Sequence, residues 1–177
     1  MYGTDELYFR IMEERDLEPM RILHNDPSTL YNLTDITPVN EVMQKKWFES
    51  MSQSKSSKRY VVCTKQGGSE VILGLVRFNE IDFVNRNMLV GLDIMPQFRG
   101  QGLGTKTYKL MCDYCFKELN MHKVTLYVGN FNDRGKHLYQ KMGFKEEGVL
   151  KEALYRDGKY HDCIIMSLFR RDCLNNG

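Results

Sequence analysis

The sequence predicts a mixed α/β (α+β) protein in which residues 1–177 form a single domain. Three observations support this prediction. The chain has 177 residues, of which 42% are hydrophobic, so it can bury one full core. In the first half, Arg59–Cys63 and Val71–Phe78 flank a Gly67–Gly68 turn, which predicts a hairpin. In the second half, strand and helix patterns alternate, which predicts a βαβ-like arrangement.

The elements before the hairpin are predicted from apolar periodicity and from capping residues. Alternating side chains indicate a strand, and apolar residues three or four apart indicate a helix. Thr followed by Pro is typical of an N-cap and the first helical residue. The predicted elements are a strand at Leu7–Met12, a helix from Glu13 to about His24, a loop at Asn25–Asp35, a helix opened by Thr37 and Pro38, and a loop at Ser50–Ser57.

The elements after the hairpin are more regular. An apolar run closed by Pro96 is typical of a buried central strand, and the glycine-rich segment that follows it opens a long amphipathic helix. The predicted order is a strand at Met88–Met95, a helix from Leu103 through Cys115, a strand at Lys123–Val128, a helix through Gly135 and Met142 that stops at Gly143, and closing strands at Phe144–Leu150 and Tyr160–Phe169 around an Asp157–Gly158 turn.

Composition argues against several classes of partner. The formal net charge is only +2, so no concentrated basic surface for nucleic acid is expected. The first residues lack the pattern of a targeting peptide, and no run approaches the ~20 apolar residues of a membrane span. Five scattered cysteines predict reduced thiols and a cytoplasmic protein, and the Cys112–Cys115 pair lacks the second ligand pair of a zinc site. We therefore expect no metal, no membrane and no nucleic acid.

The motif with the clearest chemistry is Arg-Gly-Gln-Gly-Leu-Gly at 99–104. Alternating glycines let the backbone approach a ligand closely where a helix begins, and a helix N-terminus offers free N–H groups to a pyrophosphate. Arg99 adds a cation. The spacing fits neither the dinucleotide fingerprint nor the P-loop. Taken by itself, the segment is also compatible with an ordinary tight connection between a strand and a helix.

Two segments resemble the signatures of the GNAT superfamily. Pro96–Gly104 (PQFRGQGLG) is similar to its acetyl-CoA loop, and Asn132–Phe144 (NDRGKHLYQKMGF) is similar to its second signature, with Gly135 where the family usually has Ala. The resemblance covers roughly residues 59–174. It is strongest to the branch of ribosomal-protein N-terminal, amino-sugar and spermidine acetyltransferases, with Val76–Arg86 most similar to the spermidine enzymes. It implies a mainly antiparallel mixed sheet flanked by helices, with the acetyl-CoA loop at the start of the central helix.

The resemblance also implies which residues hold acetyl-CoA. The backbone near two strand residues would pair with the pantetheine arm, the glycine-rich loop would hold the diphosphate, and an asparagine would contact CoA beyond the thioester. These implied cofactor-binding residues are Ile94, Met95, Arg99, Gly100, Gln101, Gly102, Leu103, Gly104, Thr105 and Asn132.

The implied reaction is direct attack of a neutral amine on the thioester, with a proton donor for the departing thiolate. By resemblance, Tyr139 is that donor, and a phenol with a pKa near 10 is protonated at neutral pH. A core aromatic is the alternative reading of Tyr139. The base is less defined, because Leu89 stands where many relatives have a carboxylate. Glu80 is the leading candidate, with Asp82 and Asp93 behind it.

The function expected is therefore acetyl-CoA-dependent N-acetylation of a primary amine on a small molecule, with a spermidine-like polyamine as the leading acceptor. An amino-sugar nucleotide, a protein N-terminus and a non-catalytic CoA-binding module are the alternatives. The His24–Glu41 segment holds three acids, Asp26, Asp35 and Glu41, while cations that suit an anionic acceptor are Lys45, Lys46, Lys58 and Arg59. A homodimer is compatible with these expectations.

Overall fold

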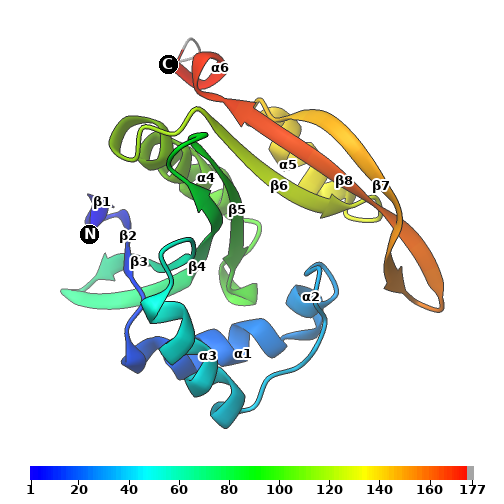
Figure 1. The fold of residues 1–177 in the computed structure, drawn as a ribbon. Helices are drawn as coiled ribbons and strands as arrows, with labels where there is room; N and C mark the ends of the chain where they lie inside the picture. The colour runs from blue at the N-terminus through cyan, green and yellow to red at the C-terminus, as the bar shows by residue number, and fades with distance from the viewer. Residues whose placement is uncertain (175–177) are drawn as a thin grey trace.

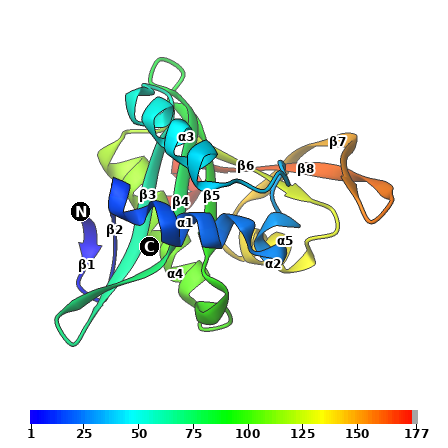
Figure 2. The same cartoon turned by 90° about the horizontal axis from the view of Figure 1, so that it is seen from below.

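The computed structural model describes residues 1–174 and contains one mixed sheet with helices on both faces (Figure 1; Figure 2). The sheet has eight strands in the order β1-β2-β3-β4-β5-β6-β8-β7. The strands are β1 (Tyr2–Thr4), β2 (Leu7–Ile11), β3 (Lys58–Gln66), β4 (Ser69–Asp82), β5 (Asn87–Ile94), β6 (Lys123–Gly129), β7 (Lys145–Arg156) and β8 (Lys159–Phe169). The mixed α/β class predicted from the sequence is confirmed.

The helices belong to two groups. The first group follows β2 and comprises α1 (Leu17–Asn25), α2 (Pro27–Leu30) and α3 (Glu41–Gln53). The second comprises α4 (Leu103–Asp113), α5 (Asp133–Lys141) and α6 (Arg170–Leu174). A π-helical turn at Tyr114–Glu118 extends α4, and short 3₁₀ turns occupy Glu14–Asp16 and Pro96–Phe98.

Strand pairing creates an opening in the middle of the sheet. Every neighbouring pair is antiparallel except β5 and β6, which run parallel. These two strands pair only where Asn87–Leu89 meets Lys123–Thr125. Beyond Leu89 they diverge, and within residues 1–174 no strand pairs with the remainder of β5 on that side. The backbone groups on this side of β5 are therefore available to a ligand.

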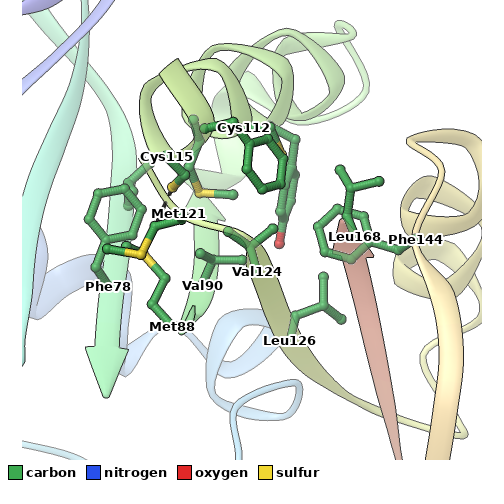
Figure 3. Close-up of a cluster of buried hydrophobic side chains, with 14 of the residues drawn as sticks. Phe78, Met88, Val90, Cys112, Cys115, Met121, Val124, Leu126, Phe144 and Leu168 are labelled. Carbon is green, nitrogen blue, oxygen red and sulfur yellow. Dashed lines mark hydrogen bonds between the residues drawn. The ribbon is translucent and has the colours of Figure 1, made fainter. Parts of the chain in front are cut away.

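The two sheet faces bury separate cores. The larger core packs α4, its π turn and α5 against β3–β6 and β8, and Met111, Phe116 and Val124 within it have no exposed surface. Figure 3 shows Cys112 and Cys115 in this cluster, and the Cys115 Sγ lies 3.8 Å from the Met88 Sδ. The two cysteines are buried free thiols, so their role in the fold is packing. The smaller core joins side chains of β2, α1 and β3 on the opposite face.

The structure corrects the predicted start of the second long helix. We expected Thr37 as N-cap, but α3 begins at Glu41 and the Asn40 Oδ1 accepts from the Met43 N–H at 2.9 Å. The Thr37 N–H instead donates to the Asp35 carboxylate at 2.9 Å, which forms a local turn. Asn is among the strongest N-cap residues, so it outcompetes the Thr-Pro pair three residues earlier. The helix also continues to Gln53, into the stretch predicted as a loop.

Three further boundaries differ from the sequence prediction. The stretch expected to be a loop, Asn25–Asp35, contains α2, whose N-cap Asp26 accepts from the Thr29 N–H and whose first residue is Pro27. That Asp-Pro pair is a helix-start signal which the polar composition masked. The strand β1 was not predicted, and β7 runs on to Arg156 instead of ending near Leu150.

Candidate active site

A cleft of about 470 Å³ opens where β5 and β6 diverge. Four elements form its walls: the end of β5, the glycine-rich loop with the start of α4, the helix α5, and α2 from the other side. The lining residues are Ser28, Thr29, Asn32, Leu92, Asp93, Ile94, Arg99, Gly100, Gly102, Gly104, Thr105, Tyr108, Asn132, Arg134, Gly135, His137, Leu138, Tyr139 and Lys141.

The glycine-rich loop has the backbone that its sequence predicts. Gly100 and Gly102 have φ angles of +81° and +75°, in the left-handed region that other L-residues rarely adopt. Apart from the glycine itself and its two chain neighbours, no atom of residues 1–174 lies within 4 Å of the position that a Cβ would take on either residue. Gly102 is the N-cap of α4, so the unpaired N–H groups of the first helical turn face this open space. The loop and helix dipole together suit a diphosphate.

Arg99 occupies the cleft wall in an unexpected way. Its Nε donates to the Ile94 carbonyl at 2.7 Å, and its two Nη atoms each donate at 2.6 Å to the hydroxyls of Ser28 and Thr29. The guanidinium therefore fastens α2 to the end of β5. This arrangement holds α2 over the cleft, and an Asp26 carboxylate oxygen 3.9 Å from the Arg99 Nη1 partly offsets the positive charge that the guanidinium brings to this wall.

The other predicted cofactor residues separate into two groups. Four of them, Ile94, Gly104, Thr105 and Asn132, line the cleft together with the loop glycines. Three others lie outside its lining. Met95 packs in the smaller core and its N–H donates to the Leu73 carbonyl, the Gln101 side chain donates to the Gln97 carbonyl, and Leu103 packs against the larger core.

Tyr139 lies on α5, on the side of the cleft opposite α2. The helix is capped by the Asn132 Oδ1, which accepts from the Gly135 N–H at 2.8 Å. Tyr139 is half-buried, and its ring packs edge-on against Tyr108 with centroids 5.3 Å apart. Burial raises the pKa of the Tyr139 hydroxyl, against the lowering effect of a hydrogen bond with Tyr108. The phenol therefore stays protonated at neutral pH and can donate to an anion.

The candidate carboxylates differ in whether they line the same cavities as Tyr139. Asp93 lines the cleft and, with Tyr139, a smaller cavity of about 110 Å³, and its side chain is 16% exposed. Glu80 is exposed, has a φ of +50°, and lines a neighbouring hollow of about 490 Å³ with Leu89. Asp82 accepts hydrogen bonds from the Val84 and Asn85 N–H groups, which lower its pKa and close a turn. The structure thus brings Asp93 together with Tyr139, and it does not place Glu80 or Asp82 there.

Several residues that line the cleft were not predicted from the sequence. Arg134, His137 and Lys141 lie on α5 and give the cleft a basic edge. Their spacing of i, i+3 and i+7 marks one helical face, so periodicity offered a signal that was not used. Ser28, Thr29 and Asn32 were missed because the stretch around α2 was taken for a loop, and no local signal places it against the cleft.

A second cavity of about 330 Å³ lies on the other side of β5, beneath α1 and α3. Its lining includes Trp47, Arg59, Arg77 and Asp93. The Arg77 Nη2 lies 3.2 Å from an Asp93 carboxylate oxygen. Asp93 lines both this cavity and the cleft.

Comparison with known proteins identifies the family. The model of the acetyltransferase (GNAT) domain family matches residues 6–145, which include the glycine-rich loop and the Tyr139 helix. The chain belongs to the GNAT acetyltransferase family. Spermidine N(1)-acetyltransferase of Escherichia coli K12 is 31% identical to this GNAT chain over 174 residues, covering 98% of the chain and 91% of the relative. The Vibrio cholerae enzyme of the same name is 29% identical over 186 residues, covering 97% and 98%.

Solved structures agree with this membership. The crystal structure of spermidine N-acetyltransferase from Vibrio cholerae in complex with CoA and spermine superimposes with a TM-score of 0.90 at 28% identity, covering 97% of this chain and all of that one. This GNAT chain is accordingly an N-acetyltransferase that uses acetyl-CoA, and the open glycine-rich loop, the helix N-terminus and the basic edge fit that cosubstrate. Among residues 1–174, no helix is long and apolar enough to cross a membrane, and no three His, Cys, Asp or Glu side chains form a metal-binding group.

Proposed function

We propose that this enzyme transfers the acetyl group of acetyl-CoA directly to a primary amine of a small molecule, with a spermidine-like polyamine as the acceptor. The observation that carries the proposal is that one acidic residue, Asp93, lines both the cleft that fits acetyl-CoA and the second cavity, and shares the lining of the cleft with Tyr139. The polyamine assignment is supported by the spermidine acetyltransferases of Escherichia coli and Vibrio cholerae, which match almost the whole chain.

The hollow that Glu80 lines gives a polyamine a route to the reaction centre. It shares Arg77, Val90 and Gly91 with the small cavity that contains Asp93 and Tyr139. Leu89, in the same hollow as Glu80, is four residues before Asp93 on β5, or about 13 Å at the usual rise of a strand. Glu80 has no ion-pair partner among residues 1–174. One amine of a polyamine would lie near Asp93 while a distal ammonium pairs with Glu80.

Different residues of the cleft would bind acetyl-CoA and donate the proton. The glycine-rich loop and the α4 N-terminus would hold the diphosphate, the basic edge of α5 would pair with phosphate groups, and the Ile94 backbone would pair with the pantetheine arm. The Met95 N–H donates to the Leu73 carbonyl and the Met95 carbonyl accepts from the Phe98 N–H, so Ile94 is the better placed of the two for that pairing. Bound acetyl-CoA supplies the thioester, and Tyr139 would protonate the departing thiolate.

The base would receive the amine's surplus proton. Asp93 is the carboxylate that shares a lining with Tyr139, so it would be the first acceptor. Glu80, the leading candidate from the sequence, lines only the outer hollow, so it would pair with the distal ammonium instead of accepting this proton. Arg77 holds the Asp93 carboxylate in place from the other side.

The experiment is an acceptor panel with acetyl-CoA. Spermidine, an amino-sugar nucleotide and a short peptide with a free N-terminus are each supplied, and free thiol and acetylated product are measured. Spermidine should give the highest kcat/KM. Thiol release no faster than in buffer for every amine would show a CoA-binding module, and turnover of the peptide or the sugar alone would replace the polyamine assignment.

We also propose that the enzyme acts in the cytoplasm as a homodimer. The five cysteines of the chain are free thiols, which supports a reducing compartment. The β7–β8 hairpin extends away from the body of the molecule, and its exposed apolar side chains support a contact with a second copy (Figure 1). These side chains are Val149, Leu150, Tyr155 and Tyr160. Light scattering on the purified protein measures the mass, and a monomer at micromolar concentration would contradict the homodimer.

A further inference from the structure

The cavity beneath α1 and α3 carries two arginines side by side, a feature that the polyamine proposal does not use. Arg59 on β3 is directly opposite Arg77 on β4 in the register of the antiparallel pair. Side chains in this position have Cβ atoms about 5 Å apart, and like charges there destabilise a sheet. Both side chains line the cavity. A pair of guanidinium groups held together at this cost indicates a role for their combined charge.

Neither guanidinium has a full set of protein partners. The Arg59 Nη1 donates to the carbonyls of Lys58 and Phe78, and among residues 1–174 no carboxylate lies within ion-pair distance of Arg59. Arg77 reaches Asp93 through Nη2 only, and its Nε is buried without a hydrogen-bond partner in the described chain. The cavity therefore has more positive charge than its own carboxylates neutralise at contact distance.

The surroundings make this charge costly to hold without a partner. Burial, followed by repulsion from Arg77, lowers the pKa of Arg59 to about 10, while Asp93 acts in the opposite direction. The other acid of the lining, Asp35, is exposed and accepts the Thr37 N–H, so it serves a turn at the rim. An uncompensated buried cation is costly unless an anion pairs with it. The missing partner is an anion.

Three further features shape the cavity for a ligand. A Cβ on Gly91 would come within 2.9 Å of the Arg77 guanidinium, so the glycine gives this guanidinium the room to lie over β5. Gln44 is 6% exposed, and its Oε1 has no hydrogen-bond donor among residues 1–174. Trp47 covers Arg59 with the guanidinium carbon 5.6 Å from its ring centroid. The cavity thus offers two cations, one unused acceptor and an aromatic wall.

We propose that this cavity binds an anionic group, a carboxylate or a phosphate, of a second class of acceptor: primary amines that carry a negative charge. The inference rests on the proposed acetyltransferase function and adds a class of acceptor beside the polyamine. Arg59 and Arg77 would hold the anion and determine specificity, while the amine would lie toward Asp93, which lines both the cavity and the cleft. A bidentate guanidinium contact suits both anions.

The reaction on this acceptor is the same acyl transfer. The neutral amine nitrogen forms a bond to the thioester carbonyl carbon, and the carbon–sulfur bond breaks to give the amide and the CoA thiolate. The nitrogen's surplus proton leaves toward Asp93 and solvent. The thiolate takes a proton from Tyr139, which recovers one from solvent.

The test compares amines in matched pairs that differ in the anion. The carboxylate arm sets 4-aminobutyrate against 4-aminobutan-1-ol, the phosphate arm sets glucosamine 6-phosphate against glucosamine, and spermidine is the reference. In at least one arm, the anionic amine should have a kcat/KM about ten- to a hundred-fold above its neutral analogue, the range expected for charged hydrogen bonds. The arm with the larger ratio identifies the anion.

Variants of the full chain locate the effect. Arg59→Gln should lower the ratio of anionic to neutral turnover about tenfold through a raised KM, and Arg59→Lys should lower it less. Lys46→Gln removes an exposed cation of α3 that does not line the cavity, and it should leave the ratio unchanged. Thermal unfolding shows whether each variant is folded. If a variant does not fold, the comparison of anionic and neutral amines with the wild-type enzyme still tests the proposal.

The outcomes separate the two proposals. If spermidine is acetylated and the anionic and neutral amines have equal kcat/KM values, the anion site is overturned. The acetyltransferase assignment then remains. A preference for the anionic amine that Arg59→Gln leaves intact would also overturn the anion site. No thiol release with any amine would overturn the proposed function, and with it this inference.

Discussion

Replacement of Tyr139 by Phe removes one oxygen atom and leaves the ring. The ring packs against Tyr108 and Phe144, with centroids 5.3 Å and 6.1 Å away, so these contacts persist in the variant. The groups that we assign to acetyl-CoA are the glycine-rich loop, the α4 N-terminus and the basic edge of α5, and the substitution leaves all of them in place. We therefore expect the fold and the affinity for acetyl-CoA to be nearly unchanged, and the loss to fall on turnover.

The size of the loss follows from the role of the hydroxyl. General acid catalysis contributes about 10²- to 10⁴-fold, which sets the upper range. The adjoining cavity of about 110 Å³ has room for a water molecule that could replace the phenol as a donor. The Tyr108 hydroxyl, which is hydrogen-bonded to Tyr139, is a second possible donor. These substitutes reduce the expected loss in kcat to about ten- to a thousand-fold.

Steady-state kinetics with the best acceptor of the panel, together with a calorimetric titration of acetyl-CoA, measure the two effects separately. Burial raises the pKa of Tyr139 above 10, so the protonated, donating form prevails at neutral pH and the wild-type rate should not fall through loss of this proton below about pH 10. If kcat of the wild type declines above about pH 10 because Tyr139 ionises, this decline should be absent in the Phe variant. Unchanged kcat in the variant would refute the acid role and leave Tyr139 as a packing residue.

Three other substitutions test the cleft and the fold. Gly102→Val should weaken acetyl-CoA binding at least tenfold by calorimetry, because φ is +75° and the new side chain would enter the cleft; equal affinity would contradict the loop assignment. Arg134→Gln should raise the Kd for acetyl-CoA about tenfold at low salt and less at high salt, because salt screens the attraction between Arg134 and a phosphate group. An unchanged Kd would show that Arg134 contacts only solvent. Arg10→Met should lower the free energy of unfolding, measured in urea at pH 7, by about 2–4 kcal/mol. The reason is that the Asp16 carboxylate, whose side chain is 2% exposed, loses its guanidinium partner and remains buried.

The Arg10 substitution also has a pH signature. Hydrogen bonds from Arg10 lower the pKa of Glu70 to about 2, below its unfolded value near 4.5. A lowered folded-state pKa stabilises the fold above the unfolded value, and this contribution is lost as the pH falls from about 4.5 toward 2. The difference in unfolding free energy between wild type and Arg10→Met should narrow over that window. A constant difference would show that Glu70 takes no part.

The sequence predicted the sheet well where local pattern and tertiary contact agree. The strands β3 to β6 and the helix α4 combine strong periodicity with clear boundaries, such as Pro96 after β5 and Gly102 before α4. The predictions failed where two local signals competed. Thr37-Pro38 and Asn40 are both valid helix starts. The structure uses the second, where the Asn40 side chain caps α3 and Gln44 of that helix donates to the Leu17 carbonyl at the start of α1.

The site was predictable where the chemistry lies in a local motif. The glycine-rich loop and the Tyr139 helix are contiguous in the sequence, and both line the cleft. The pairing of Arg77 with Asp93 depends on the register between β4 and β5, which no local pattern specifies. The position of Arg99 against α2 joins residues about 70 apart in the chain. Register and long-range docking are tertiary properties, so these contacts could not be derived from the sequence.

Gly135 shows how a substitution that is neutral in the sequence acquires meaning in the structure. Read as a motif, Gly in place of Ala exchanges one small residue for another. In the structure, a Cβ at 135 would lie 2.8–2.9 Å from the side-chain atoms of Asn132, which caps α5 by accepting the Gly135 N–H. The glycine therefore permits a tight asparagine cap, worth about 1 kcal/mol to the helix. Because α5 presents both Tyr139 and the basic edge to the cleft, the small residue and the cap fix the position of the proposed acid.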